Sequence, residues 1–262
     1  MAGPASLLHA PTVLFVTALV VAFSGGLMMF AKGRRREADA IGVWAAAMLL
    51  AAMGFVLAGV GQGVAWLSDG VGTAVFLAAT SVSWAAARVF AERPRRPWLT
   101  CAGPVLWLAT LPVLSAYPGQ ACYWLAGACF VGTGYILATA RELWRTRTEE
   151  LPSRTAALIL LLGHAAVYAA RGADALAGAP PADWAGTIAI AMLLEGLLHT
   201  IGMAFVLLAM VKERVELRTS QQLRALALQD GLTGIGNRRT SMRGWRPRSA
   251  APGACVRPWR CC

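Results

Sequence analysis

Charged side chains are scarce in this chain. Asp, Glu, Lys and Arg make up 14% of its 262 residues, whereas a soluble domain carries about 25%. Hydrophobic residues make up 57%, and they are gathered in blocks of about 20, the length that crosses the hydrocarbon core of a bilayer. The composition excludes an ordinary soluble domain. It predicts an all-α integral membrane protein, because backbone groups in lipid must find their hydrogen bonds within their own segment.

The apolar blocks predict about seven transmembrane helices. Gly and Pro within them are compatible with helices that span a membrane. We expect the spans at residues 12–31, 41–61, 71–90, 98–116, 122–140, 154–174 and 186–211.

Basic residues are missing from every second loop. "GQGVAWLSDG" and "SAYPGQ" contain no Lys or Arg, whereas "KGRRRE", "AERPRR" and "RELWRTRTEELPSR" are rich in them. Basic loops stay in the cytoplasm, so we expect the N-terminus outside and the C-terminus inside. The net charge of +11 is therefore interpreted as membrane-orienting charge, the lipid bilayer is the expected partner, and no nucleic acid is expected.

The cysteine spacing indicates neither disulfides nor a metal site, and the N-terminal segment does not read as a cleaved leader. Three of the six cysteines lie inside apolar blocks and three in the last eight residues, with no CxxC pair or Cys/His metal spacing. The N-terminal segment has no basic region before its apolar run, which favours an uncleaved first helix over a signal peptide. A disulfide framework and a zinc finger are thus excluded.

The last span is followed directly by "VKERVELRTSQQLRALALQ". Alternating charges and good helix formers predict that the helix continues through residues 212–229. Its ragged heptad of apolar residues allows two interpretations: a parallel coiled coil that makes a homodimer, or a solvated helical stalk.

After the stalk the chain reads "DGLTGIGNRR". This segment closely resembles the D-x-L-T-G-x-x-N-R-R motif that opens the GGDEF domain of diguanylate cyclases, and a multi-span sensor followed by a helical linker is typical of bacterial inner-membrane cyclases. The resemblance implies a seven-span sensor domain at 1–211, a signalling linker at 212–229 and the start of an α/β GGDEF domain at 230–239. The matching residues are Asp230, Leu232, Thr233, Gly234, Asn237, Arg238 and Arg239.

The resemblance also implies a reaction, the joining of two GTP molecules into cyclic di-GMP with Mg²⁺. The metal-binding carboxylates and the guanine site of the family follow the opening motif, but residues 240–262 contain no Asp, Glu or Lys. We therefore assign no catalytic or cofactor-binding residue and expect this chain to be inactive, since phosphoryl chemistry needs metal ligands. A frameshift and a genuine short regulatory tail both explain residues 240–262, which we expect to be disordered. The competing function is a non-enzymatic seven-span receptor or small-molecule carrier with a vestigial motif.

Four ionisable residues lie inside the last two predicted spans, where such residues are costly and often functional. His164 and Arg171 share one face of the sixth helix, and Glu195 and His199 share one face of the seventh. Counting depth at about 1.5 Å per residue predicts an Arg171–Glu195 ion pair above a His164–His199 pair. Three interpretations are open: polar contact between helices, a site that senses a ligand, proton or metal, or side chains that face lipid without a role. Two histidines and a carboxylate could hold a transition metal, but no further strong ligand accompanies them, and no metal is assigned.

Overall fold

The computed structural model describes residues 10–32, 39–61, 64, 66–116, 121–178 and 182–227, and all regular structure in these ranges is helical. Each predicted apolar block forms a helix, and a short π-helix, η3, precedes the third. The elements are α1 (Ala10–Lys32), α2 (Asp39–Val60), η3 (Trp66–Gly72), α3 (Thr73–Phe90), α4 (Pro97–Ala116), α5 (Ala121–Arg145), α6 (Ser153–Ala177) and α7 (Ala182–Ala227).

Six of these helices are long and apolar enough to cross a membrane, and the fourth provides a shorter apolar helix, Pro97–Val113. Large apolar side chains point outward: Leu19, Phe30 and Phe205 are 71%, 87% and 75% exposed. A soluble protein rarely exposes so much apolar surface, whereas lipid tails solvate it. The prediction of a multi-span helical membrane protein is confirmed at this level.

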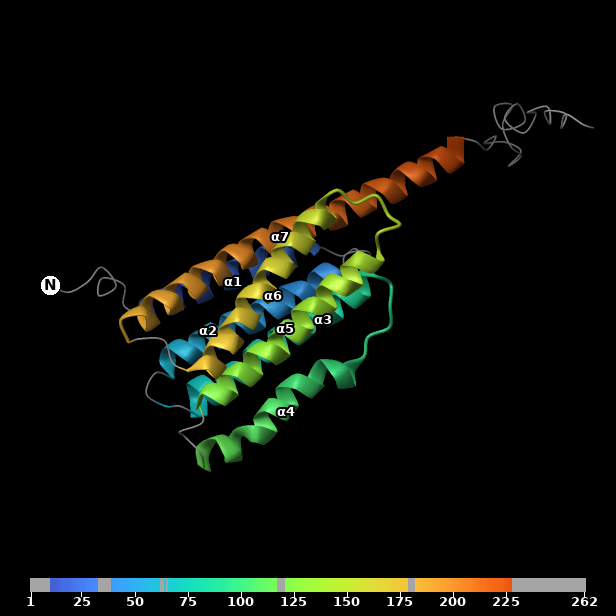
Figure 1. Ribbon diagram of the computed structural model, residues 1–262. Helices are drawn as coiled ribbons and strands as arrows, with labels where there is room; N and C mark the ends of the chain where they lie inside the picture. Colours follow the sequence, from blue (N-terminus) through green and yellow to red (C-terminus); the bar gives the residue numbers. More distant parts are fainter. Residues whose placement is uncertain are drawn as a thin grey trace, which may run out of the picture. The chain divides into compact units, whose positions relative to one another are not determined.

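The chain divides into two compact units, Met1–Glu213 and Arg214–Cys262. In the first unit the helices pack in the order α1, α2, α3, α5 and α6, with α4 against α3 (Figure 1). In the second unit the described residues are the last part of α7, which is helical to Ala227. The family motif at 230–239 and the tail at 240–262 lie outside the described residues.

Small residues allow the helices to approach closely, as is usual in membranes. At Gly25 in α1, an added Cβ would lie 3.2 Å from the Ala45 carbonyl oxygen of α2. At Gly172 in α6, it would lie 3.2 Å from the Cys129 Cβ of α5. These contacts place the α1–α2 and α5–α6 pairs as tightly packed neighbours.

Helix α4 is held by the hydrogen bonds of two side chains, Tyr135 and Trp107. The Tyr135 hydroxyl donates to the Leu99 carbonyl at 2.7 Å and accepts from the Gly103 N–H at 3.0 Å. These two backbone groups are the ones that an undisturbed helix would join directly, so the hydroxyl is inserted into the backbone ladder of α4. Trp107 Nε1 donates to the Gly70 carbonyl at 2.9 Å and fastens η3 to α4.

A buried ion pair joins α3 to α5 near the basic loops. Arg88 Nη1 lies 3.1 Å from Glu142 Oε1, and the two side chains are only 6% and 5% exposed. Arg88 also donates from Nε and Nη2 to the Pro94 carbonyl, at 3.0 and 2.8 Å. Arg93 and Arg145 approach the same carboxylate from the surface. Three guanidinium groups are thus gathered around one buried carboxylate, and the buried guanidinium of Arg88 has three hydrogen bonds.

Candidate functional site

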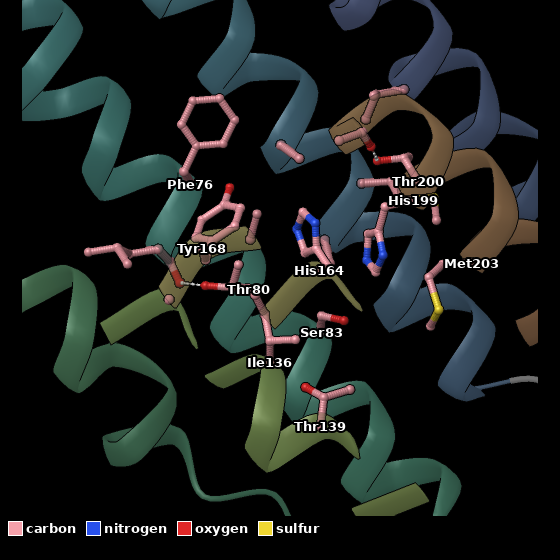
Figure 2. Close-up of a pocket in the computed structure, with 18 of the residues that line it drawn as sticks. Phe76, Thr80, Ser83, Ile136, Thr139, His164, Tyr168, His199, Thr200 and Met203 are labelled. Atoms are coloured by element: carbon pink, nitrogen blue, oxygen red, sulfur yellow. Dashed lines mark hydrogen bonds between the residues drawn. The ribbon is translucent and has the colours of Figure 1, made fainter. Parts of the chain in front are cut away.

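A cavity of about 340 Å³ lies inside the first unit, between six of its helices. Val21 of α1, Trp44 of α2, Phe76 of α3, Leu161 of α6 and Met203 of α7 are among the side chains that line it, and α5 closes another side. Its volume falls within the range of small-molecule sites, about 300–1,000 Å³. Figure 2 shows the labelled side chains around this space.

The lining is apolar apart from a few polar groups. Thr80, Thr139 and Thr200 donate their hydroxyl hydrogens back to carbonyls of their own helices, at 2.8–3.0 Å. Their oxygens retain acceptor capacity toward the cavity. An apolar wall with a small number of polar groups is the usual composition of a binding pocket.

The two histidines predicted from the last two spans line this cavity, and the predicted glutamate lies beside them. His164 Nδ1 lies 2.9 and 3.0 Å from the two carboxylate oxygens of Glu195. The rings of His164 and His199 are stacked, with centroids 3.8 Å apart and planes inclined by 8° (Figure 2). The predicted proximity of the two histidines is confirmed, and both line the cavity.

The predicted Arg171–Glu195 ion pair is wrong, because Glu195 pairs with His164. The depth estimate assumed that α6 and α7 run level with each other. At the start of α6, the Ser153 N–H and hydroxyl donate hydrogen bonds to Glu213 of α7, at 3.3 and 2.5 Å. From that contact His164 is eleven residues away along α6, and Glu195 is eighteen residues away along α7. Equal counts would be needed for level helices, so the two axes are inclined and Arg171 lines the cavity elsewhere.

His199 contains a buried nitrogen with no hydrogen-bond partner. Among the described residues its Nδ1 is one of four buried side-chain nitrogens without one. An unsatisfied buried polar atom costs about 1–3 kcal/mol. On the other side of the stack, the Tyr168 ring lies 4.7 Å from that of His164, tilted by 55°. In this stack, Nδ1 of His164 is hydrogen-bonded to Glu195 and Nδ1 of His199 is not hydrogen-bonded.

Helix α7 contributes one wall of the cavity but packs less tightly than the others. Among the described residues, its backbone has no neighbour as close as α2 is to α1 or α6 to α5. It is connected to α6 mainly through side chains: Glu195 to His164, Glu213 to Ser153, and Gly202 against Leu160. A helix held in this way can shift when one of those side-chain contacts changes.

Sequence reasoning found the two histidines and Glu195, and missed the Arg88–Glu142 pair. Arg88 falls within the predicted span at residues 71–90, and the structure buries it. Glu142 was assigned to a loop, but α5 extends to Arg145. The one available signal was a single acidic residue between basic ones in "RELWR". The motif residues at 230–239 fall outside the described part of the chain.

Comparison with protein-family models, with curated proteins and with solved structures finds no match to this chain.

Proposed function

We propose that the chain is a membrane signal-transduction protein of the diguanylate cyclase family, in which the helical domain senses a signal and α7 transmits it. The observation that carries the proposal is the position of α7. The same helix provides His199 to the cavity wall and Glu195 to the cluster beside it, and remains helical to Ala227, three residues before the "DGLTGIGNRR" segment. In this proposal, input and output share one helix.

In this proposal the seven helices are seven spans, α4 included, with the N-terminus in the periplasm of a bacterial inner membrane. Ligand in the cavity changes the contacts of His164, Glu195 and His199, and α7 shifts against α6. Two stalks pair as a coiled coil, since each half of a family dimer holds one GTP. Residues 1–262 provide the sensor and linker, and none of the carboxylates that the cyclase chemistry requires.

Family membership is tested by reading the gene beyond the codon for Thr240 in all three frames. A GGDEF-domain frame there supports the proposal. Its absence from every frame favours a receptor or carrier without cyclase output.

Transmission through α7 is tested by fusing residues 1–229 to an intact diguanylate cyclase domain and assaying cyclic di-GMP in membranes. Thr219→Pro removes a backbone donor and breaks the helix at about 3 kcal/mol, and the matched control Thr219→Ala keeps the helix. Thr219 is an exposed residue, so neither change disturbs the core. We expect the proline variant to uncouple the output from the membrane domain. Equal output from both variants would contradict the proposed path.

A further inference from the structure

The cluster on α6 and α7 brings together three side chains of the types that bind metal ions, His164, Glu195 and His199. One ligand atom each from His164, Glu195 and His199 can be chosen so that all three lie within 4.8 Å of one another. Ligands bound at 2.0–2.2 Å in a tetrahedron lie roughly 3.3 Å apart. A contraction of roughly 1.5 Å, within the reach of side-chain rotation, would bring the three atoms to a common ion.

The present hydrogen bonding leaves this cluster incomplete. The His164 ring is bonded to Glu195, but the buried Nδ1 of His199 has no partner. The cluster therefore includes one oriented imidazole, one carboxylate and one imidazole nitrogen that a cation could satisfy.

The chemistry of these groups selects the kind of cation. Mg²⁺ and Ca²⁺ prefer six to eight oxygen ligands, which three groups with two imidazoles do not supply. Imidazole nitrogen and carboxylate oxygen suit Zn²⁺. Two histidines and one glutamate leave the fourth tetrahedral position open, and here that position would face the cavity that both histidines line.

We propose that His164, Glu195 and His199 bind a Zn²⁺ ion at the cavity wall, and that this ion is the signal which draws α7 toward α6. The second half of this statement rests on the proposed sensor function, and the first half does not. Coordination through His164 Nδ1 moves its proton to Nε2 of the same ring. The lone pairs of stacked imidazoles lie in two parallel planes, so one ring must rotate out of the stack for both nitrogens to meet one ion.

Metal binding is measured on the full chain in lipid nanodiscs, after chelator treatment, by competition of Zn²⁺ against a chromophoric chelator. Cys255, Cys261 and Cys262 are first replaced by serine, because a cysteine cluster at the C-terminus is a competing zinc site. We expect one Zn²⁺ per chain in that background. Co²⁺ used as a probe should give the visible absorption of a tetrahedral site.

Substitutions assign the ion to the cluster. His199→Ala and Glu195→Gln should each weaken Zn²⁺ binding at least about tenfold, since even outer-shell partners of metal ligands contribute 10–100-fold. His9→Ala removes the one other histidine of the chain and should leave the affinity unchanged. Size-exclusion chromatography and thermal melts show that each variant is folded. Absence of a stoichiometric site, or unchanged affinity in both folded cluster variants, would overturn the proposal.

The failure of the sensor function would look different. If zinc binds to the cluster but the cyclic di-GMP output of the fusion does not change, the metal site stands and its role as the signal is refuted. If substitutions elsewhere in the cavity change the cyclic di-GMP output and no zinc binds, the sensor function stands and the metal site is refuted.

Discussion

Replacing Glu142 by glutamine should destabilise the membrane domain more than any change at the surface arginines around it. The carboxylate is 5% exposed and pairs with a guanidinium that is 6% exposed. Removing one partner of a buried ion pair leaves the other charge uncompensated and typically costs 3–5 kcal/mol. Arg88 keeps its two hydrogen bonds to the Pro94 carbonyl, so we expect a loss near the lower limit, about 3 kcal/mol.

The matched control is Arg145→Gln. Its guanidinium contacts the same carboxylate at 3.4 and 3.5 Å but is 35% exposed. Exposed ion pairs contribute about 0–1 kcal/mol, and Arg145 can turn to solvent. The two changes therefore probe one carboxylate from its buried side and from its exposed side.

The assay is equilibrium unfolding in mixed micelles. The free energy of unfolding is measured for Glu142→Gln, Arg145→Gln and Arg88→Gln, and for the double variant Arg88→Gln with Glu142→Gln. We expect the double variant to lose less free energy of unfolding than its two single variants lose together, because the effects of contacting residues are not additive. If Glu142→Gln lowers the free energy of unfolding no more than Arg145→Gln does, burial is not what makes the Arg88–Glu142 pair stabilising.

Three further predictions concern packing, topology and activity. Gly103→Ala should destabilise the domain and displace the Tyr135 hydroxyl, because the added Cβ would lie 2.6 Å from the Tyr135 ring; Gly134→Ala, where no atom lies within 4 Å, is the control, and equal melting temperatures for the two would count against the inserted hydroxyl. Reporter fusions at Arg95 should report cytoplasm and fusions at Asp69 periplasm, and a cytoplasmic Asp69 would overturn the orientation derived from the basic loops. The purified 262-residue chain incubated with GTP and Mg²⁺ should form no cyclic di-GMP, and product above a no-protein control would disprove the expected inactivity.

The helices could be predicted from the sequence because apolar blocks of about 20 residues have one stable form in lipid. All seven predicted segments are helical, and the structure differs mainly in helix ends, such as the extension of α5 to Arg145. That extension is also why Glu142 was missed. A residue assigned to a loop is not expected to be the buried partner of Arg88.

The candidate site could be predicted in part. Spacing along each helix places His164, Glu195 and His199 on the correct faces, because the helical repeat is fixed. The pairing between helices depends on the inclination of α6 against α7, which no single-helix pattern contains. Arg171 was therefore paired with Glu195 in error. The insertion of Tyr135 into α4 is another contact between distant segments, which periodicity within one helix does not reveal.

In the proposed function, α7 both lines the cavity and leads to the cyclase domain. Cyclic di-GMP production by the fusion of residues 1–229 to an intact cyclase domain is compared for His199→Ala and Leu198→Ala. The two residues are neighbours on α7, but His199 lines the cavity and Leu198 is 70% exposed on the outer surface. We predict that His199→Ala changes the output and that Leu198→Ala leaves it as in the unsubstituted fusion. Equal outputs from all three proteins, at equal membrane levels, would contradict the claim.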